Sequence, residues 1–181
     1  KITGIDKELV SKISADIKSI VIFIGGSNYL KNYISLAKDL SKTIYEVTFL
    51  VGSENSQKIS KKIKEISKKF KVKIDSKNIP KIIFDSDVVI SGGGYTKIEV
   101  AYLKTPVLCM PIHKHQNQLI YDFYNTFQID KKFQINLNKK NLFTGLKYLN
   151  YKNRLKLSNN FSKKFIKNGI YKILKIINEK I

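Results

Sequence analysis

The sequence contains almost no arginine or cysteine, and it has no long apolar run. Arg154 is the only arginine among 34 basic residues. This argues against a protein that reads DNA or RNA sequence, because such proteins use arginine for bidentate contacts to guanine and phosphate. Cys109 is the only cysteine, which excludes an intramolecular disulfide framework and a cysteine-based zinc site. No apolar run approaches the roughly 18 residues of a membrane span, and no secretory signal pattern follows Lys1.

Lysine, in contrast, is abundant and unevenly distributed. The chain has 181 residues, 43% of them hydrophobic, and a formal net charge of +20. This length and composition predict one ordinary domain with a core of its own. Residues 131–181 hold 14 basic residues against the single acid Glu179. The excess has four interpretations: compositional bias shared with isoleucine and asparagine, a solvated basic face, attraction to anionic lipid or an anionic substrate, or salt-dependent non-specific nucleic-acid binding.

From residue 19 onward, apolar runs alternate with segments of helical period. The runs predict strands at residues 19–24, 45–51, 70–74, 87–90, 106–110 and 133–135. The periodic segments predict helices at residues 30–42, 57–70, 79–84, 95–103, 117–127, 139–150 and 155–179, with a break at Gly169. This alternation predicts an α/β fold, a single Rossmann-like domain whose parallel sheet carries helices on both faces.

Two glycine clusters each lie between a predicted strand and a predicted helix. They are Gly25-Gly26-Ser27 and Gly92-Gly93-Gly94-Tyr95-Thr96. Ligands of open α/β sheets bind beyond the carboxyl ends of the strands. Glycine lets backbone N–H groups approach an anion there, and a helix start adds partial positive charge. The pair predicts a phosphate ligand, whereas either cluster alone is equally well explained as a turn.

The familiar phosphate motifs are absent. The sequence contains no G-x-x-x-x-G-K-[ST], so it is not a P-loop nucleoside triphosphatase. The run from Gly92 to Lys97 lacks the last glycine of G-x-G-x-x-G, and no acid follows about 20 residues later. A nicotinamide dinucleotide is therefore not expected.

Polar residues follow both the triple glycine and the strand at 106–110. Glu99 comes early in the predicted helix, where a carboxylate either assists the helix start or accepts bonds from ribose hydroxyls. The segment from His113 to Gln118 suits the hydroxyls of a sugar, although a capped loop explains it equally well. Because no third ligand accompanies His113 and His115, no metal site is predicted.

These motifs, in this order and spacing, resemble the C-terminal, donor-binding domain of glycosyltransferase family 28. The resemblance covers roughly residues 19–130, and its elements are Ile24-Gly25-Gly26-Ser27, the run from Ser86 to Ala101, the run from Thr105 to Pro111, and Gln116-Asn117-Gln118. Members have the two-domain GT-B fold. The chain is similar to the lipid-II-forming UDP-GlcNAc transferase. Residues 25–28, 31–32 and 74–79 are also similar to the UDP-sugar hydrolase of pseudaminic acid synthesis.

The resemblance assigns a role to each segment. The two glycine turns would hold the donor diphosphate, Glu99 the ribose, the backbone at Asp75-Ser76 the uracil, and residues 116–118 the sugar. The polar loop at His113 is about one residue shorter than in the lipid-II-forming transferase. Gln118 is therefore a firmer match to the sugar-contacting residues of the family than Gln116. The cluster at residues 92–94 is richer in glycine than in most members of the family, which leaves open which of these glycines meets phosphate. The expected nucleotide-sugar-binding residues are Gly25, Gly26, Ser27, Asn28, Ser76, Gly92, Gly93, Gly94, Tyr95, Thr96, Glu99, Gln116, Asn117 and Gln118.

The resemblance also implies that the enzyme has a second part. In this family the acceptor site and catalytic base lie in an N-terminal domain. We therefore expect residues 1–18 to be a linker from such a domain, residues 19–181 to bind the donor, and no catalytic residue here. The expected activity is transfer from a UDP-sugar, with UDP-GlcNAc as the expected donor, to a lipid-linked or glycan acceptor in cell-envelope carbohydrate metabolism, with no cofactor. The alternatives are a UDP-sugar hydrolase and a non-catalytic subunit of a membrane-bound partner. We expect a cytoplasmic location, peripheral to the inner face of the plasma membrane if the basic third meets lipid.

Overall fold

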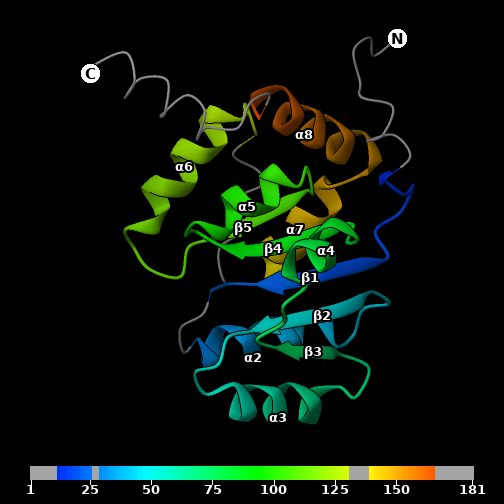
Figure 1. Cartoon of the computed structure of the whole chain (residues 1–181). Helices are drawn as coiled ribbons and strands as arrows, with labels where there is room; N and C mark the ends of the chain where they lie inside the picture. The colour runs from blue at the N-terminus through cyan, green and yellow to red at the C-terminus, as the bar shows by residue number, and fades with distance from the viewer. Residues whose placement is uncertain (1–11, 26–28, 131–138, 166–181) are drawn as a thin grey trace.

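A five-stranded parallel sheet forms the centre of the molecule in the computed structural model, which describes residues 12–25, 29–130 and 139–165 (Figure 1). The strand order is β3-β2-β1-β4-β5. The strands are β1 (Ser19–Phe23), β2 (Glu46–Val51), β3 (Lys71–Ile74), β4 (Val88–Gly92) and β5 (Val107–Met110). The predicted α/β fold with a parallel sheet is confirmed.

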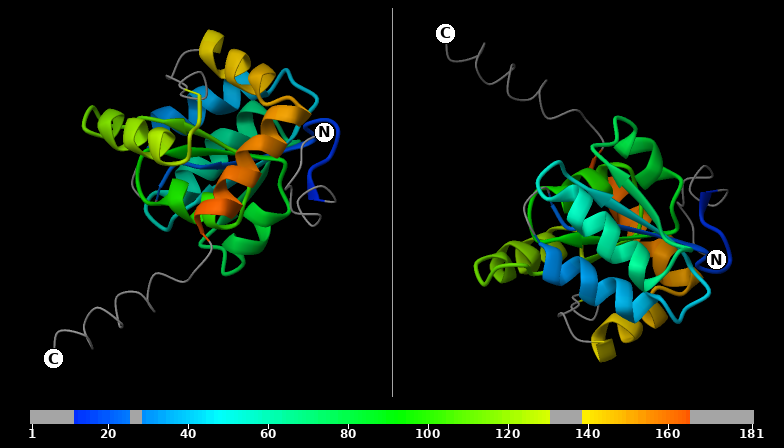
Figure 2. Two further views of the ribbon diagram at one scale, coloured as in Figure 1. Left: turned by 90° about the horizontal axis from the view of Figure 1, so that it is seen from above. Right: turned by 90° about the horizontal axis from the view of Figure 1, so that it is seen from below.

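Helices cover both faces of this sheet. They are α2 (Leu30–Leu40), α3 (Ser56–Ile66), α4 (Ile79–Phe84), α5 (Thr96–Tyr102), α6 (Gln116–Thr126), α7 (Lys139–Tyr148) and α8 (Tyr151–Lys164). Helices α2 and α3 lie together on one face, and α5 and α8 lie on the other (Figures 1 and 2). This arrangement explains why every residue of β4 and β5 is buried, since a parallel sheet covered on both sides has no solvent face.

Most of the predicted elements are confirmed, with shifts at their ends. Helix α3 ends at Ile66 rather than at residue 70, because Ser67 adopts an extended conformation and Phe70 is buried in the core. Helix α8 begins at Tyr151 rather than at residue 155, because the Asn150 side chain caps it by accepting a hydrogen bond from the Asn153 amide. The predicted strand at 133–135, the end of the last helix and Gly169 lie outside the described residues.

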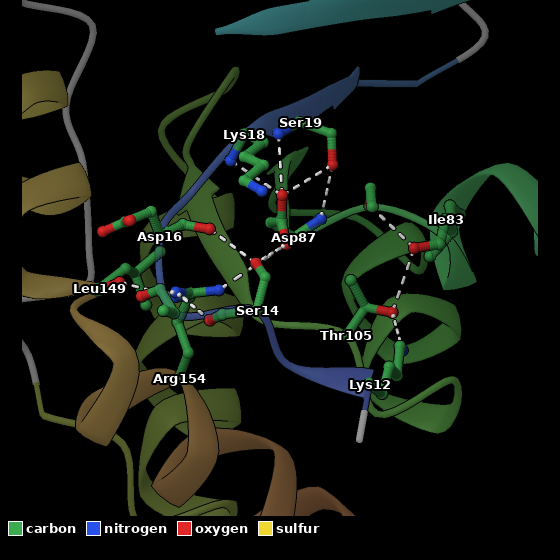
Figure 3. A network of polar contacts seen from close by, with 12 residues as sticks. Lys12, Ser14, Asp16, Lys18, Ser19, Ile83, Asp87, Thr105, Leu149 and Arg154 are labelled. Carbon is green, nitrogen blue, oxygen red and sulfur yellow. Dashed lines mark hydrogen bonds and ion pairs between the residues drawn. The ribbon is translucent and has the colours of Figure 1, made fainter. Parts of the chain in front are cut away.

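At the amino edge of the sheet, a polar network joins the segment before β1 to β4 and α8 (Figure 3). The Asp87 carboxylate accepts hydrogen bonds from the Ser14 hydroxyl, the Lys18 amide at 2.9 Å and the Ser19 amide at 2.8 Å. Arg154 is 1% exposed; it donates to the carbonyls of Leu149, Ser14 and Ala15, and one of its nitrogens lies 3.8 Å from Asp87. The only arginine of the chain therefore has a structural position, away from the carboxyl ends of the strands.

Within the described residues, no helix has the length and apolar character needed to cross a bilayer.

Candidate functional site

The predicted site residues that the structure describes lie at or beyond the carboxyl ends of β1, β3, β4 and β5, in the loops and helix starts that follow these strands. Strand register pairs Phe23 of β1 with Ser91 of β4, and Gly92 of β4 with Met110 of β5, so these strands end side by side. The chain runs from β1 outward to β2 and β3, then returns to the other side of β1 for β4 and β5. The switch point therefore lies between β1 and β4, where ligands of such sheets bind. The two glycine clusters follow these two strands.

Glycine is needed at different positions of this edge for different structural reasons. Gly25 has a φ of +121°, a conformation that other residues rarely adopt. A Cβ on Gly92 would lie 2.6 Å from the Ile24 carbonyl oxygen, and one on Gly93 would lie 2.6 Å from Cβ of Gln116. Around Gly94 no atom lies within 4 Å of such a Cβ. Gly92 and Gly93 therefore let loops pack together, whereas Gly94 is the glycine of this cluster that borders open space.

Gln116, which was expected to contact the donor sugar, joins two loops in this structure. Its side chain is 9% exposed, and its Oε1 accepts hydrogen bonds from the amides of Gly93 at 3.2 Å and Ile112 at 2.8 Å. The amide of Gly93 is thus already engaged within the protein. Asn117 and Gln118 are exposed at the start of α6. Their side-chain amides donate to the Lys114 carbonyl at 2.9 Å and to the Asp122 carboxylate at 2.8 Å.

Glu99 faces a large cavity with apolar walls. The cavity has a volume of about 700 Å³ and is lined by Phe23, Ile79, Pro80, Ile83, Ile98, Glu99, Tyr102, Leu103 and Phe165. Ile79 and Pro80 begin α4, only a few residues after the predicted site residue Ser76, whose hydroxyl accepts a 3.4 Å hydrogen bond from the Asn78 amide. The structure thus brings the exposed Glu99 carboxylate and the start of α4 to one apolar cavity.

Tyr29 and His113 connect the loop after β1 with the loop after β5. The Tyr29 hydroxyl lies 3.3 Å from Nε2 of His113, their rings meet edge to face, and the His113 and His115 rings are stacked with centroids 5.6 Å apart. Tyr95 and Thr96 begin α5, with Tyr95 89% exposed. The predicted residues Gly26, Ser27 and Asn28 lie outside the described residues. Among the described residues, no group of three or more metal-ligating side chains exists.

Lys97 belongs to this site, although it was not predicted from the sequence. Its side chain is 5% exposed, and its Nζ donates hydrogen bonds to the carbonyls of Gly93 at 2.6 Å and Gly94 at 2.9 Å. Burial lowers the pKa of this amine. Helical side chains lean toward the helix N-terminus, so a lysine three residues after a glycine turn can reach back to that turn. This spacing is the sequence signal that could have identified it.

Comparison with known proteins identifies the family of this chain. Residues 19–175 match the family model "Glycosyltransferase family 28 C-terminal domain". No curated protein sequence matches the chain.

Three solved structures illustrate the fold. MurG of Acinetobacter baumannii has a TM-score of 0.71 at 12% identity, over 97% of this chain and 54% of that chain. A putative UDP-N-acetylglucosamine 2-epimerase of Listeria monocytogenes has a TM-score of 0.62 at 15% identity, over 100% of this chain and 50% of that chain. Spinosyn rhamnosyltransferase SpnG complexed with thymidine diphosphate has a TM-score of 0.59 at 15% identity, over 83% of this chain and 43% of that chain.

At these identities the structural likeness shows the fold, and the family model shows more, since it spans most of the sequence. This chain covers about half the length of the MurG chain that it resembles. It forms one Rossmann-like unit of the GT-B architecture found in its glycosyltransferase neighbours. The chain belongs to the glycosyltransferase family 28 C-terminal domain family.

Proposed function

We propose that this chain is the donor-binding domain of a glycosyltransferase that uses a UDP-sugar, with UDP-GlcNAc as the expected donor. The observation that carries the proposal is that β1 and β4, the two strands followed by glycine clusters, end side by side at the switch point, and that Phe23 at the end of β1 and Glu99 line one cavity. This arrangement offers backbone amides for phosphate, a carboxylate for vicinal hydroxyls and apolar walls for a base.

Each part of the donor has a candidate position. The Gly94 side of the triple glycine borders open space, so a diphosphate can approach the backbone there. Glu99 stands one turn further along α5 and would accept hydrogen bonds from the ribose hydroxyls. The base would lie near Ser76, against Ile79 and Pro80 of the cavity wall. SpnG, which shares the fold, is complexed with thymidine diphosphate, and this supports a nucleoside diphosphate as the ligand class.

The acceptor side of the reaction is proposed to lie outside this chain. We expect a lipid-linked or glycan acceptor, bound by an N-terminal domain or a separate membrane subunit that also supplies the catalytic base. Domain closure would then complete the active site. The domain alone would bind donor without transferring sugar, and it would require no cofactor or metal.

We also propose that the basic C-terminal third contacts anionic lipid at the membrane where lipid-linked acceptors reside. Exposed lysines of α8 support this, because Lys152, Lys156, Lys163 and Lys164 all belong to one helix. Such clusters are attracted to anionic headgroups.

Calorimetry on the chain tests the proposed ligand. UDP and UDP-GlcNAc are expected to bind, GDP and CMP to bind more weakly, and Glu99→Ala to lower UDP affinity about tenfold, through the loss of hydrogen bonds between the carboxylate and the ribose. Glu65→Ala is the matched control, because Glu65 is an exposed acid on α3, on the opposite face of the sheet, and pairs with Lys62. Absence of heat with every nucleotide and sugar nucleotide would refute the proposal.

A further inference from the structure

Lys97 lies directly beneath the glycine turn that follows β4. Its Nζ is held between two successive carbonyls, those of Gly93 and Gly94, at 2.6 and 2.9 Å. The residue belongs to α5, but its side chain runs back along the helix to the turn that precedes it. Proteins seldom bury lysine in this way, because a buried cation is costly unless its surroundings compensate the charge.

The two hydrogen bonds fix the direction of two peptide groups. In a trans peptide the carbonyl of one residue points opposite to the N–H of the next, and the described chain contains no cis peptide. Because the carbonyls of Gly93 and Gly94 point inward to Lys97, the N–H groups of Gly94 and Tyr95 point outward. A Cβ on Gly94 would have no atom within 4 Å, so the turn borders open space at this residue. Lys97 thus orients two adjacent donors away from the protein interior.

The charge of Lys97 has little compensation from within the protein. Among the described residues, no carboxylate forms an ion pair with its Nζ, and its nearest aromatic contact is Phe123, with the ring centroid at 5.8 Å. The neighbouring thiol of Cys109 is fully buried, which raises its pKa to about 12 and leaves it neutral at physiological pH. Two carbonyl dipoles are therefore the main partners of this cation. An anion on the outer side of the turn would add the missing opposite charge.

We propose that Lys97 is a positioning residue for the diphosphate of the donor, which orients the amides of Gly94 and Tyr95 and supplies positive charge beneath them. This inference rests on the proposed donor-binding function. If Lys97 positions the diphosphate, the loss of affinity on replacing it should grow with the number of phosphates in the ligand. A lysine that only packs the core would affect all ligands alike. A ligand with two phosphates should depend on Lys97 most, a monophosphate less, and a nucleoside not at all.

The test compares UDP, UMP and uridine on the same variants of the whole chain. Calorimetry measures UDP, and NMR titration measures the weaker UMP and uridine. Lys97→Met nearly keeps the length of the side chain but removes its charge and its hydrogen-bond donors. It should lower the affinity for UDP about tenfold, while the affinity for uridine should change less than about twofold. Lys97→Gln is a milder change. It should lower the affinities in the same order, UDP most and uridine least, but by smaller factors. Lys61→Met on α3 removes one exposed charge elsewhere and should leave all three affinities unchanged.

The outcomes separate this inference from the function on which it rests. If the wild-type chain binds UDP and both Lys97 variants bind it equally well, the role of Lys97 is refuted and the donor site stands. An equal loss for UDP, UMP and uridine would indicate a purely structural lysine and would also refute the inference. If the wild-type chain binds none of the three, the donor-binding function itself is refuted, and the inference falls with it. If Lys97→Met does not fold, Lys97→Gln provides the same comparison.

Discussion

At the scale of single residues, neighbouring glycines of one turn have unlike roles. Gly92 lies where β4 passes the backbone of Ile24, and the space for a Cβ is occupied by a carbonyl oxygen at 2.6 Å. Gly94, two residues later, has no atom within 4 Å of the corresponding position. The sequence Gly-Gly-Gly does not distinguish these positions, because the difference comes from segments that are distant in the chain. Substitution by alanine should separate them.

We expect Gly92→Ala to destabilise the fold by about 2 kcal/mol, because the new methyl group meets rigid backbone. Gly94→Ala should change stability by less than about 0.5 kcal/mol, yet lower UDP affinity, because its methyl group occupies the open side of the turn. Urea unfolding measures the first effect and calorimetry with UDP the second. Equal stability of the two variants would contradict the structural assignment of Gly92.

At the scale of elements, the sequence predicted the strands well because burial on both faces gives them a strong local signal. The runs that form β1, β4 and β5 are almost wholly apolar, and turns with glycine or proline limit them. Helix ends were predicted less well. The start of α8 depends on one side-chain cap by Asn150, and the end of α3 depends on the burial of Phe70 by tertiary packing.

The candidate site could be predicted only to the level of its loops. The topology rule placed both glycine clusters at one edge, and the structure confirms that their strands are neighbours. The hydrogen bonds of Gln116 to Gly93 and Ile112 could not be predicted, because they require two loops to meet in space. From the sequence alone, a glutamine in a polar loop is equally consistent with a ligand contact.

Asp87 connects three elements, and its loss should be visible in the stability of the whole fold. Burial alone would raise the pKa of this carboxyl, but hydrogen bonds from Ser14, Ser19 and Lys18 outweigh burial and hold the pKa below its ordinary value. A carboxyl whose pKa is lowered by folding stabilises the protein above its unfolded pKa, about 3.9, and this contribution is lost as the pH falls through the folded pKa.

We therefore expect Asp87→Asn to lower the free energy of unfolding by about 2 kcal/mol at pH 7. The difference from wild type should stay constant down to about pH 5 and shrink below about pH 4. Asp85→Asn is the control, since the exposed Asp85 pairs only with Lys81 among the salt bridges of the described residues and a surface ion pair contributes little. Urea titrations across this pH range provide the measurement. A difference that does not depend on pH would show that the Asp87 charge is not what stabilises the network.

At the scale of the whole molecule, the charge of +20 belongs almost entirely to lysine. The one arginine is buried against carbonyl groups and Asp87, so it adds nothing to a basic surface. Ammonium groups on long flexible stems suit a diffuse attraction to anionic headgroups better than bidentate recognition. Replacing the lysines of α8 therefore tests whether the basic charge at this place on the molecule binds lipid, or whether the lysine excess reflects composition alone.

We expect the chain to sediment with vesicles rich in phosphatidylglycerol at about 50 mM salt and to be released at about 500 mM, because screening shortens electrostatic attraction. Phosphatidylcholine vesicles should not bind it. Replacing Lys152, Lys156, Lys163 and Lys164 of α8 by glutamine should reduce binding severalfold. The matched variant replaces Lys58, Lys61, Lys62 and Lys68, in and just beyond α3, and removes the same charge from the opposite face of the sheet. An equal reduction by both variants would contradict a membrane-facing α8, because it would mean that net charge alone determines binding.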